Sequence, residues 1–453
     1  MADPTATDAA EPGTGASAES GGAAPDAGAD LGRRRFFRQF AGDIASTAAT
    51  LVGTAQALQR TSAELAGAIL DPVRDEPAAA EGPTVQPADR GPVFRTAFRI
   101  EGSTITFVDQ RALPGRLVEH AAGSAADVTW AIRNGTLNGG PAAGQSAAIG
   151  MALTAARLRG TKPYARRATF RGAANALRNA APTNGSVATA LERVMGVYAR
   201  IGELSEDGDA IAGGMRAEAD AIVAEAVADH GALVEAGVAW LATLPRNGEE
   251  PLRLVVHGPG GTLAGGQFGT ALSIAITAHQ QEIPIRVIVP EGRPRFVGSR
   301  ISSWELAAAA VPHVLVADAA APSLIAKADV DAILVPADRV AANGDVAAAI
   351  GTYPLAVVAN RHGVPVVACV AASVIDPSSK DGSAMSIGSF DADEVDRFEK
   401  HALAPPGTET RAPTHDVTPA ELITTWLVAT GPRRPPFEAL PGDPDPAPAE
   451  EPA

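Results

Sequence analysis

The sequence predicts an α/β protein in which a small N-terminal domain, made of a β-hairpin and helices, precedes a domain built on a parallel β-sheet. Ala-rich amphipathic runs occupy residues 125–231, and short β-branched runs follow after Glu250, most of them separated by helical stretches. Strands that alternate with helices form βαβ units, whose parallel strands are covered by helices on both faces. The β-branched runs are 252–257, 285–289, 313–317, 332–336 and 365–370.

Composition and charge argue against a nucleic-acid-binding protein, a membrane-spanning protein and a protein with an intrachain disulfide. The chain has 453 residues, of which 46% are hydrophobic, and a net charge of −15. The acidic balance argues against nucleic acid as a partner. No uninterrupted apolar run reaches the roughly 20 residues of a membrane span. The single cysteine, Cys369, excludes an intrachain disulfide, and its apolar surroundings indicate an inert core residue.

Both ends of the chain differ from its middle. Residues 1–32 and 432–453 are mixtures of Ala, Pro, Gly and acidic residues without apolar periodicity. Such segments bury too little surface to offset the entropy of ordering, so we predict two disordered acidic tails. Residues 71–93 are punctuated by proline and are predicted to be a linker.

The segment 33–70 has two interpretations. Its start, RRRFFR, resembles a twin-arginine export signal. Apolar residues from Phe37 to Leu65 recur mostly at spacings of three and four, which favours an amphipathic helix, and Asp43 is poorly placed inside a signal. We predict the helix and a cytoplasmic protein, with export as the alternative. A basic start beside an apolar stripe also suits a protein or membrane-surface partner through residues 36–70.

The N-terminal domain is predicted to span residues 94–249. Alternating segments on either side of Glu101-Gly102 indicate a β-hairpin. The helical region that follows is predicted to break at three places rich in glycine or proline, at 139–141, 181–182 and 213–214.

The second domain, predicted at 250–431, carries the candidate chemistry. Ligands of parallel sheets bind beyond the carboxyl ends of the strands. Run 252–257 ends in His257 and a glycine-rich turn containing Gly258, Gly260 and Gly261, which serves either ligand contact or tight packing. Run 332–336 leads to Asp338, either a general acid–base group or a turn carboxylate. Arg293 and Arg339 follow strand ends as well, and the histidine spacing suggests no metal site.

Long ordered motifs lie between Phe94 and Gly431. They are VDQRALP (108–114), AIRNGTLNGGPAAG (131–144), GTAL (269–272), EGRPRFVGSRISSWEL (291–306), ADRVAANGD (337–345), IGTYPLAV (350–357), HGVPV (362–366) and DVTPAELIT (416–424). Together they resemble the family of methylthioribose-1-phosphate isomerase, ribose-1,5-bisphosphate isomerase and the regulatory subunits of initiation factor 2B. The resemblance implies a Rossmann-like second domain, a homodimer, and interconversion of aldose and ketose phosphates without cofactor or metal.

The residues that carry the family's chemistry depart from its pattern. The family's catalytic aspartate is matched by Asp338, but its catalytic cysteine is matched by Gly258, which has no side chain to act. Five positions on the phosphate side are also replaced, and each charge-assisted hydrogen bond to a phosphate contributes about 1.5–3 kcal/mol. Those positions hold Asn138, Ala181, Val297 and the pair Ala348-Ala349.

We therefore expect a family member without the standard isomerase activity that binds or regulates through a remade pocket. Its ligand is expected to be sugar-like or nucleoside-like and less anionic than a sugar phosphate. The alternatives are a divergent isomerase with Asp338 as acid–base group, and a scaffold that recruits a partner through 36–70. We also expect Gly258 and Asp338 to lie close together. The predicted pocket contains His257, Gly258, Gly260, Gly261, Arg293, Asp338, Arg339 and Asn138.

Overall fold

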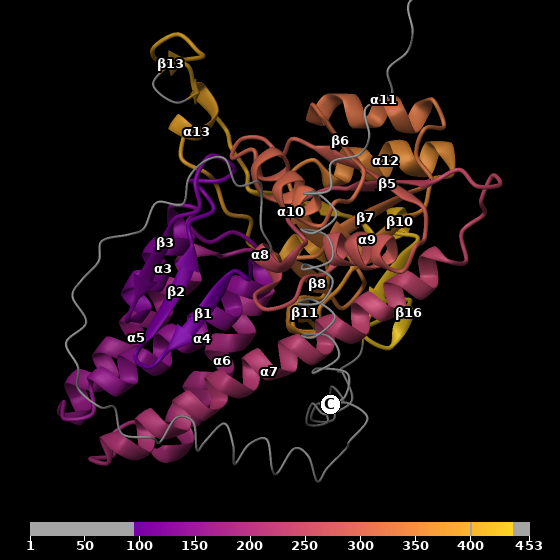
Figure 1. The fold of residues 1–453 in the computed structure, drawn as a ribbon. Coiled ribbons are helices and arrows are strands. Elements are labelled where there is room, and N and C mark those ends of the chain that lie inside the picture. Colours follow the sequence, from indigo (N-terminus) through magenta and orange to yellow (C-terminus); the bar gives the residue numbers. More distant parts are fainter. Residues whose placement is uncertain (1–94, 399–400, 438–453) are drawn as a thin grey trace, which may run out of the picture. The chain divides into compact units, whose positions relative to one another are not determined.

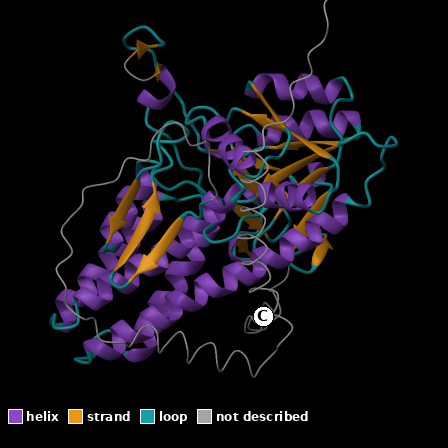
Figure 2. Ribbon diagram, in the orientation of Figure 1, coloured by secondary structure: helices purple, strands orange, loops and turns teal. Residues whose placement is uncertain are grey.

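The computed structural model describes residues 95–398 and 401–437, shown in Figures 1 and 2. The described part begins with an antiparallel sheet of β1 (Phe98–Glu101), β2 (Thr104–Val108) and β3 (Glu119–Ala122), in the order β1-β2-β3. The first two strands form the predicted hairpin, and Gly102 takes the positive φ of 56° that the turn requires. The third strand was not predicted because its sequence, EHAA, lacks β-branched residues.

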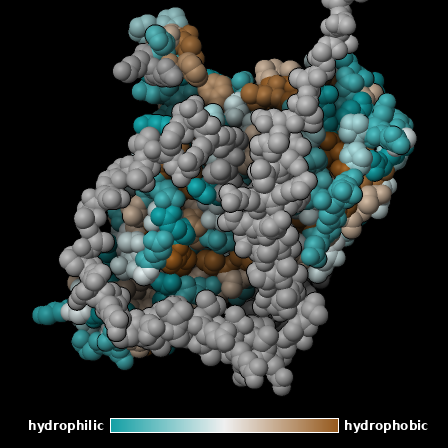
Figure 3. Space-filling model, in the orientation of Figure 1, coloured by the Kyte–Doolittle hydropathy of each residue, from teal (hydrophilic) through white to brown (hydrophobic). Residues whose placement is uncertain are grey.

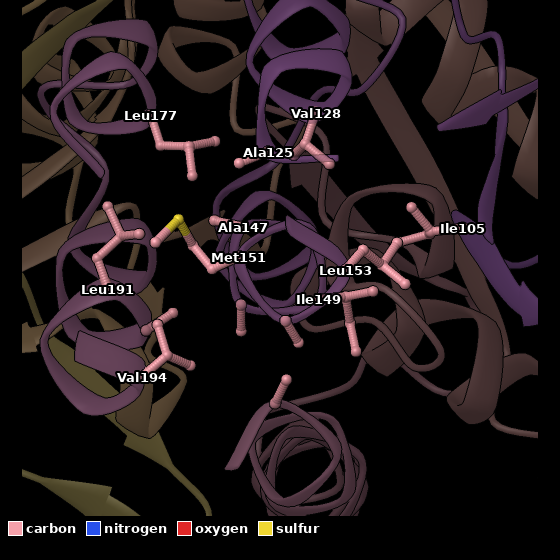
Figure 4. Packing of buried hydrophobic residues seen from close by; sticks show 14 of the residues in the cluster. Ile105, Ala125, Val128, Ala147, Ile149, Met151, Leu153, Leu177, Leu191 and Val194 are labelled. Atoms are coloured by element: carbon pink, nitrogen blue, oxygen red, sulfur yellow. The ribbon is translucent and has the colours of Figure 1, made fainter. Parts of the chain in front are cut away.

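Five helices follow, and one of them lies at the centre of the first core. They are α3 (Ala125–Arg133), α4 (Gly140–Arg157), α5 (Pro163–Ala180), α6 (Gly185–Ile201) and α7 (Gly208–Leu241). Every residue of α4 from Gly140 to Ala155 is buried. Figure 4 shows its Met151, between Leu177 and Leu191, in the apolar cluster around this helix. A helix that is apolar on all sides is a core helix, so α4 is held rigidly from several directions.

The predicted break at Gly213-Gly214 is wrong, because α7 runs through it without interruption. A Cβ atom on Gly214 would lie 2.8 Å from Ile201 Cδ1, so the small residue permits close helix packing. The later part of α7 reaches the second domain, where Gly237 packs against Ile274. The helix therefore spans the two halves of the described structure.

A seven-stranded sheet forms the second domain, in the order β16-β15-β10-β7-β4-β5-β6. The five predicted runs are confirmed as β4 (Leu252–Val256), β5 (Ile285–Pro290), β6 (His313–Val316), β7 (Ala332–Pro336) and β10 (Val366–Cys369). All neighbouring pairs among them are parallel, and β15 (Thr425–Val428) continues the parallel order. Only β16 (Gly431–Arg433) is antiparallel.

Short helices connect and cover these strands. They are α8 (Thr262–Gly265), α9 (Ala271–Gln280), α10 (Ser303–Ala308), α11 (Ala321–Ala326) and α12 (Thr352–His362). Helix α9 packs on β4, β5 and β7 and against α7, whereas α11 and α12 pack on each other. Cys369 is 1% exposed on β10, and burial raises the pKa of its thiol, as expected of an inert core residue.

A second, smaller sheet was not predicted, and it shapes the site. It has the order β11-β8-β9-β14, with β8 (Arg339–Ala341), β9 (Val346–Ala349), β11 (Ile375–Asp376) and β14 (His415–Thr418). Strands β8 and β9 pair antiparallel around the Asn343-Gly344 turn. Strands of two to four residues give too short a pattern to be predicted from a sequence, so these strands depend on tertiary pairing.

The segment between β11 and β14 projects from the domain and carries α13 (Asp393–Asp396), β12 (Arg397–Phe398) and β13 (His401–Ala402). Figure 3 shows apolar surface on this projection, where Phe398 and Leu403 are at least half exposed. Within residues 95–398 and 401–437, no helix has the length and apolar character needed to cross a membrane. The predicted tail, helix and linker before residue 94 lie outside the described residues.

Candidate active site

A cavity of about 530 Å³ lies where the two domains meet. The N-terminal domain contributes the ends of α3, α4 and α5 and the turn before α6, and the second domain contributes Asp338 and residues of the projecting segment. Hydrogen bonds that join the domains include Gln110 Nε2 to Leu263 O, Gln145 Nε2 to Gly265 O and, next to the cavity, Gly185 N to Asp338 O and Gly388 N to Thr183 Oγ1. The cavity is therefore built from elements with fixed mutual positions.

Asp338 lies in this cavity at the carboxyl edge of the parallel sheet, two residues after β7 ends. Its backbone N–H donates to Ala347 O at 2.9 Å, and its carbonyl accepts from Gly185 N at 2.9 Å. The side chain is 17% exposed. A Cβ atom on Gly140 would lie 2.6 Å from Asp338 Oδ1, so glycine at the first residue of α4 leaves room for the carboxylate in this position.

The predicted proximity of Gly258 and Asp338 is confirmed by the strand order. Strands β4 and β7 are adjacent and parallel, and both residues follow at their carboxyl ends. A Cβ atom on Gly258 would lie 3.2 Å from the Cβ of Ala349, which lines the cavity. The position that carries the catalytic thiol in the family therefore adjoins the cavity in this chain.

Gly258 also has a φ of 90°, a conformation that residues other than glycine rarely adopt. We predict that Gly258→Cys destabilises the fold by about 1–3 kcal/mol, because the new side chain combines this strain with a tight contact to Ala349. Urea unfolding measures the effect. The control is Gly160→Cys, where φ is not positive and nothing lies within 4 Å of the added Cβ. Equal stabilities of the two variants would contradict the prediction.

The contact of Asp338 with His415 is a feature that sequence reasoning missed. His415 Nε2 lies 3.2 Å from Asp338 Oδ2, and His415 is 20% exposed at the cavity wall. His415 Nδ1 lies 2.7 Å from Thr414 Oγ1, which also reaches Gly388 O at 3.2 Å. His415 pairs in register with Ala349 across β14 and β9. The only signal was its place directly before the DVTPAELIT motif.

The glycine-rich turn packs tightly, and the prediction that Gly260 and Gly261 line the pocket is wrong. Neither lines the cavity. A Cβ atom on Gly260 would lie 3.0 Å from Ala271, and one on Gly261 would lie 2.2 Å from Glu305 Oε2. Buried Glu305 caps this turn, since its Oε1 accepts from Thr262 Oγ1 and from Leu263 N. Burial raises the pKa of the Glu305 carboxyl to about 7.

Three further predicted pocket residues lie elsewhere. His257 is buried, its Nε2 contacts Ile350 O at 3.1 Å, and burial lowers the pKa of its imidazole. Arg339 points to Asp376, with 3.2 Å between Nε and Oδ2. Arg293 donates through its side chain to Val395 O. None of the three lines the cavity, because each side chain is held by a partner elsewhere in the fold.

Asn138 does line the cavity, as predicted, but its amide is engaged by neighbours. Its Nδ2 donates to Gln110 Oε1 and to Gly135 O. Two arginines that the sequence did not single out line the same cavity. Arg295 forms an ion pair with Glu394, whereas Arg133 has no carboxylate partner among the described residues.

Helices α4 and α6 begin at the cavity wall. Both are long, and neither has an acidic residue in its first turn. The partial positive charge of a helix N-terminus favours a bound anion. Among the described residues, no group of three or more His, Cys, Asp or Glu side chains is placed to hold a metal ion. The cavity thus combines the Asp338–His415 pair with a wall that carries charges of both signs, from Arg133 and Arg295 and from Asp391 and Glu394.

Comparison with known proteins decides the family. The model of the Initiation factor 2 subunit family matches residues 137–435. The chain belongs to this family. Methylthioribose-1-phosphate isomerase of Chloroflexus aurantiacus is 36% identical over 339 residues, which cover 75% of this chain and 95% of the relative. The resemblance that the sequence motifs suggested is therefore confirmed.

Solved structures of two members of the Initiation factor 2 subunit family share the fold. 5-Methylthioribose 1-phosphate isomerase from Pyrococcus horikoshii has a TM-score of 0.64 and 30% identity, with 76% of this chain and 94% of that chain covered. Translation initiation factor eIF-2B subunit delta from A. fulgidus has a TM-score of 0.60 and 26% identity, with 75% and 96% covered. The predicted α/β architecture is thus confirmed as that of the family.

Proposed function

We propose that this protein is an aldose–ketose isomerase acting on a sugar phosphate related to methylthioribose 1-phosphate. The observation that carries the proposal is the placement of Asp338 in a cavity between the domains, with His415 as its partner. Similarity to named isomerases supports the same reaction class. The expectation that activity is lost receives no support from these relatives.

The reaction needs groups that hold and return protons. Conversion of an aldose to a ketose moves one hydrogen from carbon 2 to carbon 1, with no net change in atoms or electrons. A carboxylate accepts a proton from carbon and returns it. Asp338 is suited to this role because it is partly exposed to the cavity and its Oδ1 is directed toward Gly140. This assignment leaves the inert Cys369 without a role in the reaction.

The anionic end of the substrate is proposed to lie against the start of α4. The first N–H groups of a helix have no partners within the helix and favour a phosphate. Helix α4 has no side-chain cap at Gly139, and Arg133 stands beside it at the cavity wall. Helix N–H groups and Arg133 would thus take over from the family's phosphate ligands that this sequence lacks.

The direct test is turnover by the purified full-length chain. We expect conversion of methylthioribose 1-phosphate to its ketose, at a rate within two orders of magnitude of the median enzyme, about 10 per second. Ketose formation is followed by NMR, because the ketone carbon is absent from the substrate. A folded protein that shows no turnover with this compound or with ribose 1,5-bisphosphate would contradict the proposal.

The second candidate function is a binding or regulatory protein without turnover. It is favoured by the absence of a side chain at Gly258 and by the small residues Ala181 and Ala349 in the cavity wall. In that case a sugar, nucleoside or phosphate ester would raise the melting temperature in the absence of any product. A homodimer, and a protein or membrane-surface partner for residues 36–70, remain proposals that accompany either function.

A further inference from the structure

We infer that His415 is the second proton-transfer group of this site and replaces the side chain that Gly258 lacks. The inference rests on the proposed isomerase function and names a residue that the family motifs do not contain. It draws on the geometry of three side chains around the cavity, Asp338, His415 and Ala349.

The register of the small sheet pairs His415 with Ala349, the residue that a side chain at position 258 would touch. A Cβ atom on Gly258 would touch Ala349 at 3.2 Å, and Ala349 is the cross-strand partner of His415. Side chains of directly opposed residues lie on the same face of a sheet, with Cβ atoms about 4.5–5.5 Å apart. His415 and a side chain at 258 would therefore share Ala349 as a neighbour. It also lines the cavity that Asp338 lines.

The contacts of His415 suit proton exchange. Its Nε2 faces Asp338 Oδ2, and its Nδ1 faces Thr414 Oγ1. Thr414 has one hydroxyl proton, which it gives either to His415 Nδ1 or to Gly388 O. With the proton on Nδ1 of neutral His415, Thr414 donates to Gly388 and Nε2 is a free base. With the proton on Nε2, Nδ1 accepts from Thr414. The hydroxyl can follow either tautomer, so the imidazole can gain or release a proton.

Isomerisation of a cyclic sugar phosphate requires two proton carriers. Carbon 2 loses a proton to Asp338, and its electron pair forms a double bond to carbon 1 as the bond from carbon 1 to the ring oxygen breaks. The ring oxygen takes a proton from the imidazolium form of His415, which becomes the neutral imidazole. Asp338 then returns its proton to carbon 1, and the 2-hydroxyl becomes the ketone as its proton passes to His415. Both groups end as they began, and no oxidant or cofactor is consumed.

The experiment compares His415→Ala and His415→Gln with the wild-type full chain, and adds free imidazole. We expect kcat of the alanine variant to be about 100-fold lower than that of the wild type, with KM within about threefold of the wild-type value. Free imidazole should raise kcat of this variant by about tenfold or more. The glutamine variant keeps a polar side chain beside Asp338 but cannot exchange a proton, so it should stay slow. The matched control is His362→Ala at the exposed end of α12, with and without imidazole.

Each outcome decides between the two proposals. A glutamine variant with wild-type kcat, or a folded alanine variant that imidazole does not rescue, would overturn the role of His415 and leave the isomerase function standing. If the alanine variant does not fold, the glutamine variant alone decides. A wild-type chain without turnover would overturn the isomerase function, and the role of His415 with it.

Discussion

Replacement of Asp338 by asparagine should lower kcat for methylthioribose 1-phosphate by about 100- to 10,000-fold, the usual contribution of a positioned acid–base group. Asparagine has nearly the same shape and leaves the backbone bonds of residue 338 to Ala347 and Gly185 in place. The fold should therefore be unaffected, because the substitution creates no cavity and breaks no buried pair. Steady-state kinetics at saturating substrate measures the effect.

The control for this loss is Asp209→Asn, since the side chain of Asp209 is 86% exposed on α7 and does not line the cavity. Its kcat should equal that of the wild type. Thermal unfolding of both variants checks that neither has lost its structure. An Asp338→Asn enzyme with undiminished kcat would show that another group moves the proton, and that the assignment of Asp338 is wrong.

The second large effect concerns stability and pH. Glu305 is buried beneath the glycine-rich turn, and burial raises its pKa from 4.5 to about 7. Its Oε2 has no hydrogen-bond partner within the part of the chain that the structure describes. Below about pH 4.5 the carboxyl is protonated in both the folded and the unfolded chain. Between pH 4.5 and 7 the unfolded chain releases its proton first, so the free energy of unfolding falls as pH rises. Above about pH 7 both states are charged and the loss is complete.

We therefore expect Glu305→Gln to remove this pH dependence. Between pH 5 and 8 the wild type should lose about 2–3 kcal/mol of unfolding free energy relative to the variant, since one pKa unit corresponds to about 1.4 kcal/mol. Glutamine keeps the oxygen that accepts from Thr262 and Leu263. Urea unfolding over this pH range measures the difference in slope. The exposed Glu421→Gln serves as the control, and identical slopes in wild type and Glu305→Gln would contradict the prediction.

Part of the site was predictable because strand ends in a parallel sheet share one edge. Residue Asp338 follows a β-branched run whose strand character is a local property of its sequence. The same argument placed Gly258 near it. Arginines at strand ends were not predictable in this way, since Arg339 and Arg293 turn toward partners that lie far along the chain, Asp376 and Val395. The direction of a long flexible side chain depends on such partners and not on its strand.

The sequence by itself determined the α/β class, the five parallel strands and the carboxylate at their edge, because hydrophobic periodicity and strand ends are local signals. Only the tertiary structure decided what surrounds that carboxylate. His415 reaches Asp338 through the pairing of β14 with β9, two strands of four residues each. Their pairing is set by contacts between distant segments. Residues such as His415, which carry no functional signal in the sequence, become neighbours of the carboxylate only when those segments meet.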